Sequence, residues 1–278
     1  MRLFARNRII SALLLSLITA AGALIWKTHV DLLPLPVSLG LETFGLQKVQ
    51  VVDRHYVPLT VTYQNRWNIH DYLPLHDIPG ILRQAFVVSE DRRFFRHAGV
   101  DWPARLHAMW QNLGALRAVR GASTISEQVI RMWHPRPRTV WSRWLEGLEA
   151  VRLEKSFSKG EILEFYLNQV PFAGQRRGVM QAAHYFFDRD PDTLSTAEIL
   201  ALVVMVRAPG RLNIRRKAMD LRHLILQLAA RPLLRGLSDE RTYARLGTDT
   251  LRIKTTDLPV NAGHFVHYVY QSTPQVYL

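Results

Sequence analysis

The chain has no cysteine, which excludes disulfides, thiolate metal sites, iron–sulfur clusters and a cysteine nucleophile. It also lacks a P-loop, a G-x-G-x-x-G turn and an H-E-x-x-H sequence, so no nucleotide-binding loop or zinc-protease helix is indicated. Lysine is scarce: 6 of the 36 basic residues are lysine, and the other 30 are arginine. The absence of cysteine does not by itself identify a cellular compartment.

The basic residues exceed the 23 acidic ones, giving a net charge of +13. Arginine carries a planar fork of donors that suits phosphate and carboxylate oxygens, so the excess indicates an anionic partner. Nucleic acid, anionic lipid and a phosphorylated substrate all fit. With 278 residues, 48% of them hydrophobic, the chain can bury a core, and a disordered or collagen-like architecture is excluded.

The N-terminus carries an uncharged run of 18 residues, Ile9 to Trp26, which is just long enough to cross a bilayer as a helix. The flanking charges are Arg2, Arg6 and Arg8 before the run and Lys27 after it. This bias places the N-terminus inside and the rest of the chain across the membrane. Ala21-Gly22-Ala23 could end a cleaved signal peptide, but the run is longer than a usual signal sequence and favours an uncleaved anchor. Export argues against a nucleic-acid partner.

Helical periodicity dominates from about Ile78 onward, so the predicted fold is mainly α. A short β-hairpin is expected before it, from residues 49–52 and 60–63. The predicted helices are 81–95, 103–113, 124–132, 139–155, 159–168, 179–186, 196–206 and 217–230. Two of them start at S-x-x-E capping boxes, Ser158 with Glu161 and Ser195 with Glu198.

Two weaker motifs are set aside. Ser156 to Lys159 fits the S-x-x-K of acyl-serine enzymes, but no S-D-N follows and the stretch already serves as a helix cap. Asp188 to Asp192 resembles the start of a calcium loop, yet it lacks the turn glycine and the closing glutamate.

An acidic pair, Glu90-Asp91, stands among cations at the end of an apolar helix. Phe94 and Phe95 should draw the segment toward the core, and a partly desolvated carboxylate can act as a general base or acid. A salt-bridged helix end explains the same residues. The carboxylate pair is therefore a candidate site that needs further support.

Two later segments could hold an anion. Gly121 to Gln128 places a glycine and the hydroxyls of Ser123 and Thr124 at a helix start, which suits an oxyanion or phosphate but also fits a simple cap. Farther on, Arg143 and Glu146 lie three apart on a helix and share a flank. The upstream cations are Arg131, Arg136 and Arg138. A pyrophosphate would fit there, and an ordinary ion pair with basic loops is the alternative.

These segments occur in a recognisable order. They are Glu90-Asp91-Arg92-Arg93-Phe94-Phe95 with His97, Gly99 and Asp101; Gly121-x-Ser123-Thr124-Ile125-x-x-Gln128; Glu146 followed by Ser158-Lys159-x-Glu161 and Tyr166-Leu167-Asn168; and Gly178-x-x-x-Ala182-Ala183-x-Tyr185-Phe186. Together they resemble the motifs of glycosyltransferase family 51, the peptidoglycan glycosyltransferases of class A penicillin-binding proteins. The sequence of residues 134–139 and 166–172 is most similar to the 1C subtype.

The resemblance implies a lysozyme-like helical domain with a small membrane-proximal lobe. It also implies polymerisation of lipid II, with inversion and release of undecaprenyl pyrophosphate. Glu90 would be the general base and Glu146 would assist the leaving group, with a divalent cation (Mg or Mn) near it and no organic cofactor. The implied substrate-binding residues are Asp91, Phe94, His97, Ser123, Thr124, Gln128, Arg131, Arg138, Arg143 and Asn168.

The expected organisation is a cytoplasmic basic tail (1–8), a transmembrane anchor (9–26), a connector with the hairpin (27–72), the glycosyltransferase domain (73–210) and a C-terminal helical extension (211–278). The catalytic domain is expected on the periplasmic side of the inner membrane. Expected partners are lipid II, the growing glycan strand, membrane lipid and separate transpeptidases, because no transpeptidase module follows.

The chain departs from the family pattern at Glu127, Ser142 and Leu145, and at Phe187-Asp188-Arg189. Glu127 would add a negative charge beside the phosphate site, and two basic positions are missing. Two alternatives therefore stay open: a degenerate lipid II or glycan binder that regulates other synthases, and a lytic transglycosylase.

Overall fold

The structure, a computed structural model, describes residues 2–41, 51–54, 59, 66–115, 123–173, 176–206, 218–235, 245–246, 251, 253 and 262–272. Over these ranges the fold is mostly helical, as predicted, and contains no β-sheet. The predicted hairpin is not shown. Residues 49–50 and 60–63 lie outside the described ranges, and the neighbouring described contact is a hydrogen bond from Leu59 N to Val51 O (3.0 Å).

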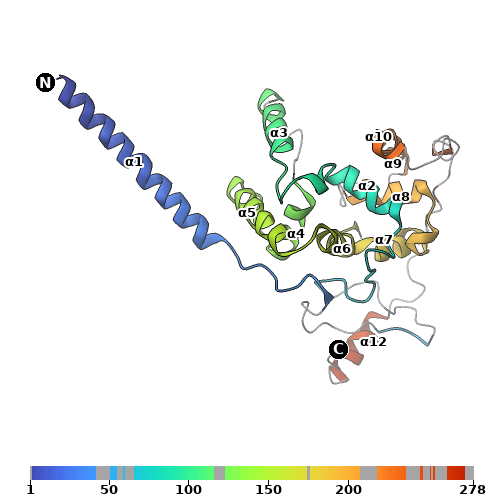
Figure 1. The fold of residues 1–278 in the computed structure, drawn as a ribbon. Helices are drawn as coiled ribbons and strands as arrows, with labels where there is room; N and C mark the ends of the chain where they lie inside the picture. Colours follow the sequence, from blue (N-terminus) through green and yellow to red (C-terminus); the bar gives the residue numbers. More distant parts are fainter. Residues whose placement is uncertain are drawn as a thin grey trace.

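A long helix, α1 (Arg2–Asp31), projects from the rest of the molecule (Figure 1). Its segment Ala12–Asp31 has a mean hydropathy of 1.5 and is almost entirely exposed. By length and composition it could cross a membrane. The helix continues five residues past the predicted end at Trp26, so Lys27 and Asp31 belong to it.

The remaining helices form the domain and its C-terminal part. They are α2 (Gly80–Glu90), α3 (Trp102–Ala115), α4 (Ile125–Trp133), α5 (Val140–Ser156), α6 (Lys159–Gln169), α7 (Gly178–Phe187), α8 (Thr196–Val206), α9 (Ala218–Ala229), α10 (Pro232–Arg235) and α12 (Gly263–Ser272). Seven predicted helices, those beginning at 103 and later, agree with these bounds to within two residues. Both predicted capping boxes, at Ser158 and Ser195, are confirmed.

The helix predicted to end at Phe95 instead ends at Glu90, which corrects that prediction. The next residue, Asp91, has φ −154° and ψ 75° and leaves the helical path. Its carboxylate accepts a hydrogen bond from Ile125 N (3.0 Å), at the start of α4. Residues 94–96 then form a short 3₁₀ turn. The contact with α4 thus separates the two acids: Glu90 belongs to the helix and Asp91 to the turn.

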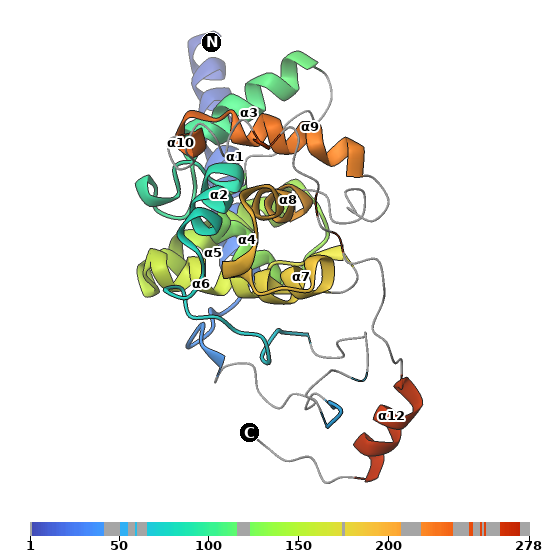
Figure 2. The same ribbon diagram turned by 90° about the vertical axis from the view of Figure 1, so that its right-hand side faces the viewer.

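The core is organised around α8, which lies between α2, α7 and α9 (Figure 2). Nine of its eleven residues are buried, and apart from Glu198 near its start all nine are apolar, as a central core helix requires. Leu221, Ile225 and Leu228 of α9 belong to the same hydrophobic cluster. The core therefore extends past residue 210, and the domain boundary predicted there remains a prediction.

Candidate active site

Helix α4 begins at a capping box that the sequence analysis did not identify. The Thr124 hydroxyl accepts a hydrogen bond from Glu127 N (3.2 Å), and the Glu127 carboxylate accepts one from Thr124 N (2.9 Å). The Thr-x-x-Glu spacing of residues 124–127 carried this signal. The box fixes where α4 starts, and α4 carries the two polar side chains that organise the candidate site.

The first of these side chains is Gln128, which lies between Glu90 and Tyr166. Its Nε2 donates to Glu90 Oε2 (3.2 Å), and its Oε1 accepts from the Tyr166 hydroxyl (3.3 Å). Burial raises the pKa of Tyr166 well above its ordinary value, and the charges of Glu90 and Asp91 raise it further. Tyr166 therefore stays protonated and donates to Gln128, which in turn orients the partly exposed Glu90 carboxylate.

The second side chain is Arg131, whose guanidinium binds both oxygens of Glu146 on α5. Nη2 lies 2.7 Å from Oε2, and Nε lies 3.2 and 3.3 Å from the two oxygens. Burial lowers the pKa of Arg131, but the bonds to Glu146 outweigh that effect and leave it raised. The ordinary ion pair between Arg143 and Glu146, which the sequence left open as an alternative, is not formed: Arg143 is exposed, and Glu146 is buried against Arg131.

Gln128 and Arg131 are three residues apart, so they project from one face of α4 with Cβ atoms roughly 5–6 Å apart. One contacts Glu90 and the other Glu146. The two predicted glutamates, 56 positions apart in sequence, are therefore both held by neighbouring side chains on one face of α4. This is the arrangement that a separate base and leaving-group site would require.

Asp91 and His97 brace this site and face away from solvent. Each Asp91 carboxylate oxygen lies 3.0 Å from His97 Nε2, and one also binds Ile125 N. The opposite ring nitrogen of His97 lies 3.9 Å from Glu154. Both side chains are buried, and their hydrogen bonds join the turn after α2 to the start of α4. This geometry lets the two residues position the start of α4, and the substrate contact predicted for them stays a prediction.

The remaining predicted binding residues fall into buried and exposed groups. Thr124 is buried, and its hydroxyl also donates to Gly99 O (2.6 Å). Phe94 is fully buried beneath Lys159, whose ammonium lies 4.3 Å from the ring centroid. Asn168 is buried and exchanges hydrogen bonds with the backbone of Leu73 (2.7 and 2.8 Å). These contacts make the three residues part of the scaffold, and their predicted role in substrate binding stays a prediction.

Three other predicted residues are accessible. Ser123 is half-buried just before α4, while Arg138 and Arg143 are exposed at the start of α5. Within the described part of the chain, no ion pair or side-chain hydrogen bond is formed by either arginine. Their guanidinium groups are therefore available to an anion arriving beside Arg131 and Glu146.

The departure at Glu127 has a structural explanation that the sequence did not reveal. Its buried carboxylate forms a salt bridge with Arg105 of α3, in addition to closing the capping box. Burial raises the pKa of Glu127, and the Arg105 charge opposes that shift. The expected unpaired negative charge is thus compensated. Ser142 and Leu145 are buried, so their side chains point into the domain.

A metal ion does not fit these residues as a protein-held group. The carboxylate of Glu146 is already bound by Arg131, and the described residues contain no cluster of three or more potential His, Asp or Glu ligands. The divalent cation predicted near Glu146 stays a prediction, and no step of the proposed mechanism involves it.

A fold of helices around two glutamates that one helix face brings together fits the transglycosylase class. The transglycosylase family model matches residues 58–230, and the chain belongs to this family. The resemblance predicted from the sequence motifs is thereby confirmed.

The relatives include class A penicillin-binding proteins. Penicillin-binding protein 1C of Escherichia coli is 35% identical over 50% of this chain and 18% of its own length. Penicillin-binding protein 1A of Aquifex aeolicus is 32% identical over 70% of this chain and 26% of its own. The chain thus aligns with about a quarter or less of each relative. A crystal structure of penicillin-binding protein 1A from Haemophilus influenzae superposes with a TM-score of 0.45 and 16% identity, covering 81% of this chain and 24% of that one.

Proposed function

We propose that the protein polymerises lipid II into glycan strands, with inversion at the anomeric carbon and release of undecaprenyl pyrophosphate. Family membership supports a peptidoglycan glycosyltransferase domain. The observation that carries the finer proposal is the pairing along α4, where Gln128 holds Glu90 and Arg131 holds Glu146. Because the two carboxylates have separate partners, one can act on the attacking hydroxyl and the other on the leaving group of the same reaction.

Glu90 is the general base in this mechanism. Its carboxylate takes the proton from the acceptor 4-hydroxyl as that oxygen attacks the donor's anomeric carbon. Tyr166 and Gln128 hold the carboxylate from the protein side, because the phenol donates to the amide and the amide donates to Glu90. A positioned base contributes on the order of 10²–10⁴ in rate.

The leaving diphosphate belongs on the other side of the bond, beside Arg131. Glu146 fixes the direction of that guanidinium, and Arg138 and Arg143 add exposed donors from the start of α5. Arginine can bind phosphate oxygens in a bidentate manner. Each donor aimed at developing charge in a water-poor site contributes about 3 kcal/mol. The arginine-rich composition therefore supplies donors where negative charge accumulates on the leaving diphosphate.

The proposal includes attachment to the membrane through α1 and a membrane-proximal lobe beside a lysozyme-like helical domain. The apolar helix α1 is long enough to hold the chain at the inner membrane, where a lipid-linked substrate resides. On α3, Trp102, Leu106, Met109 and Trp110 are exposed. Their spacing places them on one face, which fits the membrane-proximal lobe.

The test is incubation of the purified full chain with fluorescent lipid II, followed by separation of products before and after lysozyme digestion. Polymer that lysozyme degrades is expected. Glu90→Gln should reduce the rate at least 100-fold while the circular dichroism spectrum is unchanged. Glu161→Gln is the matched control, because it removes a carboxylate from the cap of α6 and should leave the rate near that of the parent.

The two alternatives predict other outcomes. A regulator would bind lipid II with no polymer from the parent protein, and a lytic transglycosylase would shorten purified glycan strands. Full activity in Glu90→Gln would overturn the assignment of the base even if polymer is made.

A further inference from the structure

Glu149 on α5 is fully buried and lies outside the mechanism described above. Four N–H groups point at its carboxylate. His134 Nδ1 lies at 3.0 Å, two nitrogens of Arg136 lie at 2.7 Å each, and Leu33 N lies at 2.9 Å. Burial would raise the pKa of Glu149, but these bonds outweigh it and hold the pKa at about 2. The group is therefore a permanent buried anion at neutral pH.

The donors and the acceptor come from three parts of the chain. Leu33 follows the end of α1, His134 and Arg136 belong to the connection between α4 and α5, and Glu149 lies in the middle of α5. Arg136 Nη2 also donates to Asp31 O (3.3 Å). Since the last carbonyls of a helix have no partner within it, this bond satisfies a group at the end of α1.

Further polar contacts run along the same junction. Trp141 Nε1 donates to Asp31 Oδ2 (2.8 Å), and Trp144 Nε1 donates to Thr28 Oγ1 (3.2 Å). Lys27 forms an i,i+4 ion pair with Asp31 (2.8 Å). We call the group Asp31, Leu33, His134, Arg136, Trp141 and Glu149 the anchor joint. It joins the last turn of α1 and the following Leu33 to α5 and to the connection before α5, where α1 meets the domain in Figure 1.

The anchor joint shares its elements with the candidate active site. Glu149 lies one turn after Glu146 on α5, and Arg136 stands two residues before Arg138. Pro137, which lies between the two arginines, and Pro135, which precedes Arg136, restrict the backbone there. A change in how the connection between α4 and α5 meets α1 would therefore move the exposed arginines that face the diphosphate.

We propose that Glu149 is a positioning residue which, through Arg136, fixes the angle of α1 against the domain and so sets how Arg138 and Arg143 face a membrane-borne substrate. The geometric part stands on the hydrogen bonds alone, and the part about the substrate rests on the proposed function. A buried ion pair of this kind costs more to break than it contributes by forming, which suits a part that must hold one geometry.

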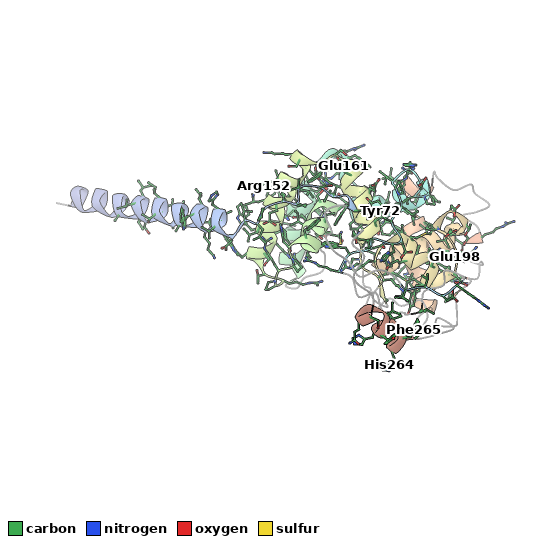
Figure 3. The ribbon with its side chains drawn as sticks, turned by 90° about the horizontal axis from the view of Figure 1, so that it is seen from below. Tyr72, Arg152, Glu161, Glu198, His264 and Phe265 are labelled. Carbon is green, nitrogen blue, oxygen red and sulfur yellow. The ribbon has the colours of Figure 1, made fainter. Side chains whose placement is uncertain are left out.

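Because the chain has no cysteine, spin labels for the test attach only at cysteines that are introduced by substitution. Ile25→Cys on α1 and Arg152→Cys on α5 are both at exposed positions, so a pair of spin labels reports the angle between these helices in the otherwise cysteine-free full chain. Figure 3 shows Arg152 and Glu161 along one edge of the domain. Distances are measured by pulsed electron resonance in vesicles of phosphatidylethanolamine and phosphatidylglycerol. A narrow distribution is expected for the parent and a width at least twofold greater for Glu149→Gln.

Three comparisons make the result interpretable. Glu161→Gln, which removes a carboxylate outside the joint, should keep the parent's width. Arg136→Lys keeps the charge but loses the two-pronged contact, so its width should be intermediate, and this variant serves where Glu149→Gln fails to fold. A parent-like distribution in folded Glu149→Gln, or in Arg136→Lys, would overturn the proposal and assign α1's orientation to apolar packing alone.

A functional measurement separates positioning from general stability. Glu149→Gln should lose about tenfold in the rate on long-chain lipid II in vesicles and keep the parent's rate on a short-chain soluble analogue. An equal loss on both substrates would show a merely structural role. If the parent makes no polymer on either, the proposed function fails, while the distance measurement still decides whether the joint fixes α1.

Discussion

At the scale of single residues, three buried glutamates are each paired with an arginine. Glu146 pairs with Arg131, Glu127 with Arg105 and Glu149 with Arg136. Removal of the arginine would leave a charged carboxylate buried without its partner, which costs about 3–5 kcal/mol. Arginine suits this work because its planar fork binds both carboxylate oxygens.

The acid stability of the protein should reveal the Glu149 pairing. The folded-state pKa is about 2, against 4.5 for the free side chain, so the stabilisation is present above pH 4.5 and is lost as pH falls toward 2. On the order of 3 kcal/mol is at stake at neutral pH. Glu149→Gln should be less stable than the parent at pH 7, and the difference should shrink between pH 4.5 and 2. Urea unfolding in micelles across this range measures it, and a difference independent of pH would contradict the prediction.

The sequence indicated which polar residues lie near one another better than it indicated which of them are bonded to each other. Glu90, Gln128, Arg131 and Glu146 were all recognisable from motif spacing, and the structure brings them together along α4. Arg143 and Glu146 share a flank of one helix, so an ion pair between them was an alternative that the sequence left open. The partner came from another helix instead, because Arg131 reaches Glu146 across the packed interface of α4 and α5. Contacts between elements of this kind leave no periodic trace in sequence.

At the scale of elements, the helices were predictable wherever local signals decided their limits. Apolar periodicity and S-x-x-E caps located α6 and α8 to within a residue. The end of α2 was not predictable, because Asp91 leaves the helix to bind the backbone of α4. The full burial of Phe94 and Asn168 was not predictable for a similar reason, since burial depends on the whole packed domain.

The turn between α2 and α3 depends on a glycine packed against α5. Gly99 has φ +87°, and a Cβ there would lie 2.5 Å from Val151 N. Gly99→Ala should therefore lower the free energy of unfolding by roughly 3 kcal/mol or more, through backbone strain and overlap together. Thermal unfolding followed by circular dichroism provides the measurement.

Gly160→Ala is the matched control for this prediction. A Cβ at Gly160 would meet its nearest atoms at 3.8 Å, and the residue lies in helix α6, where alanine is favoured by up to about 1 kcal/mol. The control should match or exceed the parent's stability. Equal stability of the two variants would contradict the close packing of the turn on α5.

At the scale of the whole molecule, the topology can be read with thiol chemistry because no native cysteine interferes. If α1 crosses the membrane with its arginines inside, Arg152→Cys should react with an impermeant maleimide in intact spheroplasts. Asn7→Cys should react only after lysis. The reverse pattern would invert the predicted orientation, and the intact mass of the purified chain distinguishes an anchor from a cleaved signal peptide.

The central helix α8 has a consequence for export. A largely apolar segment is just what a membrane-insertion channel tests for as it passes. With 11 residues, α8 would span about 16 Å as a helix, roughly half of the ~30 Å hydrocarbon layer. It is therefore too short to stop in the bilayer and can continue across it. If the domain lies on the far side of the membrane, as the sequence predicts, the short length of α8 suits both its place in the folded core and its passage across the bilayer.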